Sequence, residues 1–167
     1  DHRALIASLE ASGYDGWALS TSSKSLQDVL PLCPRGVRVC AWVKPIGVPS
    51  ATNGLHSTWE PLIVCRGRQR QPGVRDFLIA QPARFGGTLP GRKPASFVAW
   101  LFDCLGLQDG DALDDLFPGT GIVGRAWTAL TDRADAPPCR GGASLRYQGD
   151  SRVSQVLGDD NSQQERQ

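Results

Sequence analysis

The segment from Asp115 to Gly121 (DLFPGTG) has residue types and a spacing that could bind a ligand. Gly119 and Gly121 carry no Cβ, so the backbone there can turn tightly and approach a bound molecule. A helix is expected to begin just after this segment, and the free N–H groups of a helix N-terminus attract anionic or polar groups. An acidic residue at the end of the preceding strand can hold a hydroxyl or cationic group. The segment therefore predicts a ligand-binding turn between a strand and a helix.

The glycines also match the dinucleotide fingerprint, with Gly119, Gly121 and Gly124 at G-x-G-x-x-G spacing. That interpretation needs a second strand that ends in an acidic residue about 20 residues further on. The corresponding window, DRADAPPCRG, is typical of a loop, and the motif lies late in the chain rather than early. Nicotinamide-dinucleotide binding is therefore disfavoured. A nucleotide-binding α/β domain, with affinity for NAD or a nucleotide, is kept as a weaker alternative, as is a plain tight turn without a ligand.

The elements that must position this turn alternate along the chain. Apolar residues at helical spacing predict helices over His2–Ser12, Ser25–Leu32, Ala95–Leu107 and Ile122–Leu130. Short apolar runs predict strands over Gly16–Thr21, Val37–Val43, Trp59–Cys65 and Asp111–Phe117, and the Gly/Pro-rich stretch Ile46–Ser57 predicts a loop. This alternation favours an α/β three-layer sandwich.

Several pieces of the chain occur in a recognisable order. Lys93-Pro94 precedes a helix, and the helix precedes Asp115-x-Phe117-x-Gly119-x-Gly121; upstream lie AWVKP (41–45) and WEPLIV (59–64). This order resembles the permuted (β-type) DNA amino-methyltransferases, which methylate adenine N6 or cytosine N4 with S-adenosylmethionine (SAM). The resemblance covers roughly residues 1–130 and implies a Rossmann-like SAM-dependent methyltransferase domain.

The resemblance assigns roles to individual positions. It implies that the cofactor is wrapped by the glycine turn, with Lys93-Pro94 near its methionine end. The implied cofactor-binding residues are Lys93, Pro94, Asp115, Phe117, Gly119, Thr120 and Gly121.

The stretch Arg66–Lys93 is basic and mostly loop-like, with seven Arg and Lys residues against Asp76 alone. In the family this region carries the target-recognition insert, and phosphate neutralisation by several arginines suits such an insert. DNA is therefore the expected partner, and the implied contacts are Arg66, Arg68, Arg70 and Arg75. A solvated basic loop is the alternative.

The family's catalytic signature is absent from the chain. That signature is Asp, Asn or Ser followed by Pro-Pro and an aromatic residue, which hold the target amino group and stack on the flipped base. The one Pro-Pro, Pro137-Pro138, lies after the glycine turn between Ala136 and Cys139. In permuted members the signature precedes a helix like His2–Ser12, so we expect it upstream of Asp1, and the catalytic residues stay unassigned.

Without the signature's strand, the sheet is expected to lack a central member between the strands at 16–21 and 111–117. An upstream segment or a second copy of the chain would then complete it. A non-catalytic remnant that binds nucleic acid or the cofactor is the alternative function.

The composition sets the remaining limits. The chain has 167 residues, a formal net charge of +1 and no apolar stretch approaching the roughly 20 residues of a membrane span. Residues 1–130 are expected to form one domain and the polar residues 131–167 a largely mobile tail. Five cysteines without a CxxC pair and two histidines predict no metal site and favour the cytoplasm.

Two further groups of side chains have residue types that could do chemistry. His56 and Glu60 flank Trp59 and could form an acid–base pair, but a loop histidine beside a strand residue is favoured. The acidic cluster of Asp109, Asp111, Asp114 and Asp115 is interpreted as solvated turn residues rather than as metal ligands.

Overall fold

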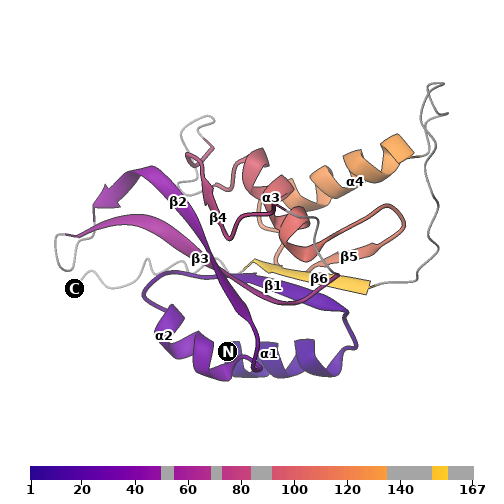
Figure 1. Ribbon diagram of the computed structural model, residues 1–167, viewed down its shortest axis with the longest axis horizontal. Coiled ribbons are helices and arrows are strands. Elements are labelled where there is room, and N and C mark those ends of the chain that lie inside the picture. The colour runs from indigo at the N-terminus through magenta and orange to yellow at the C-terminus, as the bar shows by residue number, and fades with distance from the viewer. Residues whose placement is uncertain (50–54, 69–72, 84–91, 135–151, 158–167) are drawn as a thin grey trace.

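The computed structural model describes residues 1–49, 55–68, 73–83, 92–134 and 152–157. A six-stranded mixed sheet lies between two pairs of helices (Figure 1). Helices α1 (His2–Ala11) and α2 (Leu26–Val29, continued by a 3₁₀ turn at Leu30–Leu32) cover one face, while α3 (Ala95–Leu105) and α4 (Ile122–Ala134) cover the other. The predicted α/β three-layer arrangement is thus confirmed.

The sheet order is β4-β2-β3-β1-β6-β5. Its strands are β1 (Gly16–Ser20), β2 (Arg38–Pro49), β3 (His56–Arg66), β4 (Phe77–Ile79), β5 (Ala112–Asp115) and β6 (Arg152–Leu157). Strands β1, β6 and β5 run parallel, β3 runs antiparallel to β1 and β2, and β4 runs parallel to β2.

This topology defines two opposite edges. We call the side where β1, β5 and β6 end the carboxyl edge, and the side where they begin the amino edge. Because Gly16 pairs with Arg66 and Ser20 with Leu62, β3 reaches the amino edge at Arg66 and has its first half at the carboxyl edge. In open α/β sheets ligands bind outside the carboxyl ends of the parallel strands.

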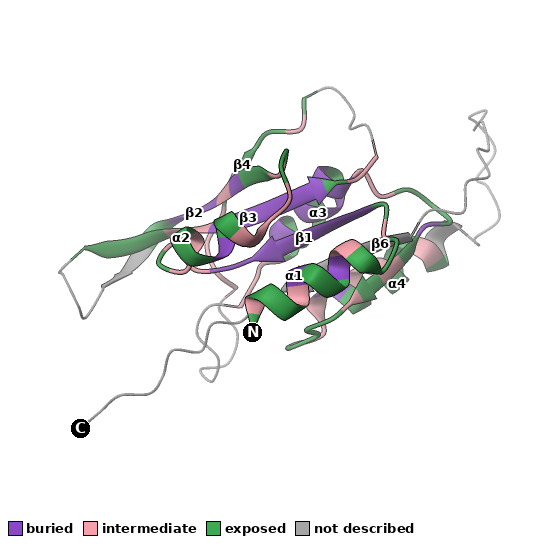
Figure 2. Ribbon diagram, turned by 90° about the horizontal axis from the view of Figure 1, so that it is seen from below, coloured by how far each residue is buried: buried purple, intermediate pink, exposed green. Residues whose placement is uncertain are grey.

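Strand β1 is the centre of the core, since all five of its residues are buried. Its side chains alternate between the faces: Trp17 and Leu19 pack against α1 and α2, and Ala18 packs on the α3 side. Figure 2 shows β1 and the middle of β3 as the buried centre of the sheet. Full burial of one such apolar side chain contributes about 1.5–3 kcal/mol.

Helix α3 fixes the position of the residues before and after it. Its buried side chains include Phe97, Leu101 and Leu105, and the helix ends at Gly106, whose left-handed φ of 69° suits a glycine cap. The predicted helix over Ala95–Leu107 is confirmed, two residues shorter. No helix within the described ranges is long and apolar enough to span a bilayer.

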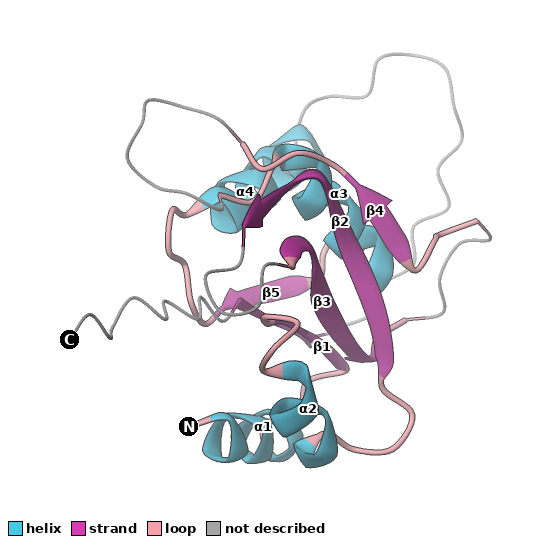
Figure 3. Ribbon diagram, turned by 90° about the vertical axis from the view of Figure 1, so that its left-hand side faces the viewer, coloured by secondary structure: helices cyan, strands magenta, loops and turns pink. Residues whose placement is uncertain are grey.

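Strand β2 runs past Lys44-Pro45 to Pro49, so the predicted loop over Ile46–Ser57 was wrong at both ends. The pairing of β2 with β3 shifts register between Val43 and Val48. A proline is tolerated at such an irregularity because its missing N–H breaks no regular ladder bond. Residues 50–54 lie outside the described residues. Figure 3 shows β2 and β3 as the long strands of the sheet.

The expectation of a sheet without a central strand was also wrong. Strand β6 lies between β1 and β5, in register from Gly16↔Val153 to Ser20↔Leu157. Residues 131–134, also placed in the tail by the sequence, complete α4. The rest of the tail lies outside the described residues. The polar local sequence does not predict β6, because strand formation there depends on pairing with β1 and β5, which are distant in sequence.

Candidate functional site

The glycine turn connects the end of β5 to the start of α4 at the carboxyl edge. Gly119 and Gly121 have φ of 46° and 66°, the left-handed region that favours glycine. The Gly121 N–H donates to the Pro118 carbonyl at 2.5 Å, and the Arg125 N–H donates to the Gly121 carbonyl at 3.1 Å to start α4. The first N–H groups of α4, which lack intrahelical partners, therefore lie beside the turn.

Asp115 has an oxygen without a partner. Its Oδ1 accepts a hydrogen bond from the Phe117 N–H at 3.3 Å, whereas its buried Oδ2 has no partner within the described ranges. Burial raises the pKa of Asp115, and the hydrogen bond from Phe117 offsets only part of that shift. An acceptor in this condition can receive a hydrogen bond from a ligand's hydroxyl or ammonium group.

Apolar side chains border the same turn. Leu116 and Phe117 are 41% and 44% exposed, so both are available to line a ligand site. Val123, in the first turn of α4, is fully buried in the core cluster that contains Trp42 and Phe97. That packing connects the turn to the region of Lys93.

Lys93 belongs to a charged cluster with Lys44 of β2 and Glu60 of β3. The two lysine Nζ atoms each lie 2.6 Å from a different oxygen of Glu60. The side chains of Lys44, Glu60 and Lys93 are 6%, 22% and 11% exposed. The Trp42 ring lies beneath both ammonium groups, with its centroid 5.4 Å from Lys44 Nζ and 4.8 Å from Lys93 Nζ.

The register of β2 and β3 builds this cluster. Trp42 pairs with Glu60, and Lys44 follows Trp42 by two positions on the same face. The Thr21 N–H donates to the Pro61 carbonyl at 3.1 Å, which ties this part of β3 to the end of β1 at the carboxyl edge. Burial alone would raise the pKa of Glu60, but the charge of Lys93 and hydrogen bonds from both lysines lower it overall.

Sequence reasoning missed Lys44 and considered Glu60 only with His56. His56 is exposed and lies four residues from Glu60 along β3, roughly 13 Å in an extended strand. The favoured interpretation of His56 as a loop histidine was wrong, because His56 is the first residue of β3. One signal for the cluster was available: Lys44 lies two positions after the buried Trp42, and Glu60 lies two positions before the buried Leu62 on the neighbouring strand.

Arg66 and Arg68 lie at the amino edge and pair with carboxylates of the chain itself. Arg66 pairs with Glu10. The Arg68 guanidinium binds Asp111 with two hydrogen bonds of 2.9 and 2.8 Å, and the Asp111 side chain is 2% exposed. These pairs give both arginines a structural role on the side of the sheet opposite the glycine turn. Their contact with DNA stays a prediction, and Arg70 lies outside the described residues.

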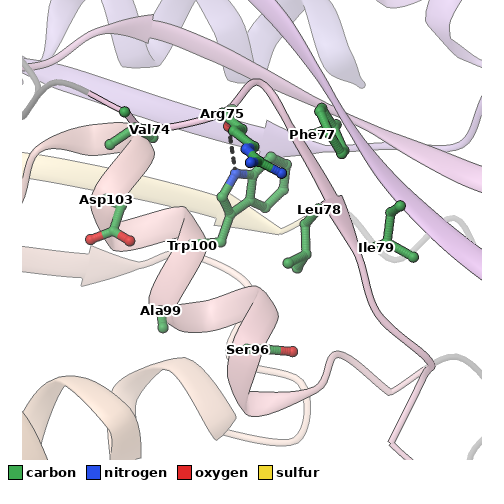
Figure 4. A pocket seen from close by; sticks show the side chains of 10 residues that line it. Val74, Arg75, Phe77, Leu78, Ile79, Ser96, Ala99, Trp100 and Asp103 are labelled. Carbon is green, nitrogen blue, oxygen red and sulfur yellow. Dashed lines mark hydrogen bonds between the residues drawn. The ribbon is translucent and has the colours of Figure 1, made fainter.

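Arg75 is exposed and borders an open groove of about 700 Å³ between β4 and α3 (Figure 4). Its guanidinium carbon lies 5.8 Å from the centroid of the Phe77 ring, which is 40% exposed. Trp100 Nε1 donates to the Arg75 carbonyl at 2.8 Å and fixes this segment on α3. No ion pair within the described ranges involves Arg75, whereas Arg66 and Arg68 each pair with a carboxylate.

The acidic residues near β5 have separate partners. Asp111 binds Arg68, Asp114 Oδ2 accepts from the Tyr14 hydroxyl at 2.8 Å, and Asp115 accepts from the Phe117 N–H. Within the described ranges no three His, Cys, Asp or Glu side chains gather as metal ligands would.

The third glycine of the dinucleotide pattern has no packing role here. A Cβ at Gly124 would meet no atom within 4 Å, whereas the fingerprint uses that glycine for close contact between helix and strand. The geometry thus agrees with the sequence argument against dinucleotide binding.

No protein-family model and no curated protein matches the sequence. Among solved structures, the fold is similar to a chain in the crystal structure of the M1.HpyAVI–SAM complex, with a TM-score of 0.60 and 11% sequence identity. The match covers 93% of this chain and 76% of the other. At this identity the likeness shows a shared fold: a mixed α/β architecture similar to that of a chain solved in complex with SAM.

Proposed function

We propose that this chain is a SAM-dependent methyltransferase domain that acts on the exocyclic amino group of adenine or cytosine in DNA. The observation that carries the proposal is the position of the Asp115 carboxylate and the glycine turn. Both lie at the carboxyl edge, on the sheet face that also holds Lys93. The likeness in fold to a SAM-bound chain supports the same cofactor.

The residues present fit this cofactor. SAM, when bound, supplies an electrophilic methyl group on its sulfonium. Asp115 Oδ2, a buried acceptor without a partner among the residues that the structure describes, is suited to a hydroxyl or ammonium group of the cofactor. The backbone at Gly119–Gly121 can approach the cofactor closely, and Phe117 provides an exposed ring for its apolar parts. Lys93 would lie near the methionine end, as the resemblance implies.

On the DNA side, the proposal requires a flipped base and a basic surface. Arg75 beside Phe77 supplies an accessible cation next to an exposed ring, a pairing that suits phosphate and base contacts. The groups that hold the target amino group stay unassigned, because the signature expected for them is absent from the sequence.

A second candidate is a non-catalytic domain that binds the cofactor or nucleic acid. The observation in its favour is β6, which lies between β1 and β5, where the resemblance implies the strand of the catalytic signature. The sequence of β6, RVSQVL, contains no Pro-Pro.

Calorimetric titration of the 167-residue chain with SAM tests the cofactor assignment, with NAD as the comparison ligand. We expect micromolar binding of SAM alone, lost in Gly119→Val. Gly110→Val is a matched control, because Gly110 also has a positive φ, 88°, but lies before β5 at the amino edge. Failure of the folded chain to bind SAM, or equal losses in both variants, would contradict the assignment.

Transfer of a labelled methyl group from SAM to unmethylated double-stranded DNA separates the two candidates. Methylated adenine or cytosine in the digested product supports the enzyme and identifies the acceptor base. SAM binding without any transfer supports the non-catalytic candidate.

A further inference from the structure

The Lys44–Glu60–Lys93 cluster has more positive than negative charge. Two ammonium groups share one carboxylate, and each of the two Glu60 oxygens is already occupied by a lysine at 2.6 Å. These two ion pairs are all the ion pairs of Lys44 and Lys93 in the described part of the chain. One positive charge therefore has no counter-charge of its own.

This surplus charge is held where solvent compensates for it poorly. The Lys44 and Lys93 side chains are 6% and 11% exposed, and Trp42 and Phe97 form an apolar floor, with Lys93 Nζ 5.3 Å from the Phe97 centroid. Burying a charge without a full counter-charge is costly, so the arrangement gains from any anion that reaches it. Glu60 is the most exposed of the three side chains, at 22%, so the cluster is not fully enclosed.

Arg92, the residue before Lys93, adds an independent observation. Its Nε is buried and has no hydrogen-bond partner within the described ranges. Arg92 Nε and Asp115 Oδ2 are the two such side-chain atoms found there. Arg92 thus adds a second buried cationic donor to the segment that carries Lys93, and such a donor hydrogen-bonds strongly to an oxyanion.

We infer that Lys44, Glu60 and Lys93 form a binding site for one small oxyanion, a carboxylate or a phosphate, at the carboxyl edge of the sheet. Glu60 holds both lysines in place and cancels one of their charges, and the anion takes the other. The site itself stands apart from the proposed function. The identity of its natural occupant rests on the proposed function: that anion is either the carboxylate of the SAM amino-acid group or a phosphate of the DNA.

The chain is well suited to a direct test, because it has only three lysines: Lys24, Lys44 and Lys93. Spectra of protein labelled with ¹³C,¹⁵N-lysine would show three side-chain signals, assigned with Lys24→Arg, Lys44→Met and Lys93→Met. Sodium acetate and sodium phosphate would be added at constant ionic strength against chloride. We expect saturable shifts of the Lys44 and Lys93 signals, and none of the exposed Lys24.

Charge variants distinguish an anion site from a purely structural cluster. Glu60→Gln leaves two uncompensated charges and should raise the acetate and phosphate affinity by at least about fivefold, whereas Lys44→Met leaves none and should lower it by at least as much. Lys44→Arg keeps the charge and should keep the affinity. Arg38→Met and Asp76→Asn make the same charge changes in an ion pair whose side chains are 66% and 54% exposed. These control variants should change the acetate and phosphate affinity less than twofold.

An absence of saturable shifts in the folded wild-type chain would overturn the inference. So would changes of the same direction in Glu60→Gln and Lys44→Met, since a structural cluster loses binding whichever partner is removed. If either variant fails to fold, the wild-type titration and Lys44→Arg still decide the outcome.

A second set of titrations identifies the occupant. SAM is compared with 5′-methylthioadenosine, which lacks the amino-acid group, and with a short DNA duplex. Charge variants that change affinity for SAM but not for methylthioadenosine identify the carboxylate, and an effect on DNA alone identifies a phosphate. Saturable acetate binding without SAM binding would support the oxyanion site and contradict the proposed function.

Discussion

The two edges of the sheet use ionic residues in opposite ways. At the amino edge two arginines each have their own carboxylate: Arg66 has Glu10, and Arg68 has Asp111. At the carboxyl edge one carboxylate, Glu60, serves two lysines, and Asp115 has an oxygen with no partner in the described part of the chain.

This difference separates groups that maintain the fold from groups available to a ligand. The Asp111 carboxylate accepts three hydrogen bonds, two from Arg68 and one from the Gln108 N–H at 2.8 Å. The Arg68 N–H in turn donates to the Leu105 carbonyl at the end of α3, where a cation also interacts favourably with the helix dipole. At the carboxyl edge, within the described residues, one oxygen of Asp115 has no partner and two lysines share a single carboxylate. On the basis of this difference we expect ligands to bind at the carboxyl edge.

The largest predicted effect on stability is at the amino edge. Asp111→Ala should lower the free energy of unfolding by about 3 kcal/mol, because it strands a partly buried guanidinium and the Gln108 N–H. For a domain of this size that is a fall in Tm of roughly 6–12 °C. SAM affinity should stay within twofold. Thermal and urea denaturation measure the loss of stability. A large loss of SAM affinity in the folded variant would contradict the assignment of a purely structural role to Asp111.

At the carboxyl edge, Glu60→Gln should cost about 2 kcal/mol at neutral pH, because two mostly buried ammonium groups lose their shared counter-charge. The pKa of Glu60 is lowered by folding, so its contribution is present above the unfolded pKa and is lost as pH falls through the lowered value. Urea denaturation of both proteins at pH 7, 5 and 3.5 checks this. A stability difference that persists unchanged at pH 3.5 would contradict it.

Asp115→Asn should have a smaller effect on stability and of opposite sign. Folding raises the pKa of Asp115, so the charged carboxylate is a cost above that pKa, and stability is lost as pH rises through it. The variant should therefore be slightly more stable at pH 7, with the gain vanishing at acid pH. Its SAM affinity should fall by about tenfold, from one lost hydrogen bond to a charged acceptor. Increased SAM affinity, or reduced stability at pH 7, would count against a ligand role for Asp115.

The smallest effect is expected at the exposed pair Arg38–Asp76, with 3.1 Å between the charged atoms. Asp76→Asn should change the free energy of unfolding by no more than about 0.5 kcal/mol, because solvent screens exposed pairs. Urea denaturation provides the measurement. A change in the free energy of unfolding above about 1 kcal/mol would contradict the expectation that exposed ion pairs contribute less to stability than buried ones.

Local sequence patterns predicted the glycine turn and the main helices. The turn follows from the conformational demands of Gly119 and Gly121, and α3 follows from apolar spacing bounded by Pro94 and Gly106. Both depend on interactions within a few residues, which composition and spacing record directly.

The charged clusters could not be predicted in the same way. Glu60 meets Lys44 through strand register and Lys93 through the approach of α3, and Asp111 meets Arg68 across 43 positions. Strand β6 was missed because its partners, β1 and β5, are distant in sequence. Register and long-range pairing decide these contacts, and neither leaves a periodic signal in the chain.

Backbone amide shifts on addition of SAM test directly whether SAM binds at the carboxyl edge, because one experiment reports on both edges. We predict that the amide signals of Leu116, Phe117, residues 119–123, Lys44, Glu60 and Lys93 move with SAM concentration. Signals of Arg66, Arg68 and residues 108–111 should stay in place. Shifts confined to the amino edge, or no shifts at saturating SAM in a folded chain, would contradict it.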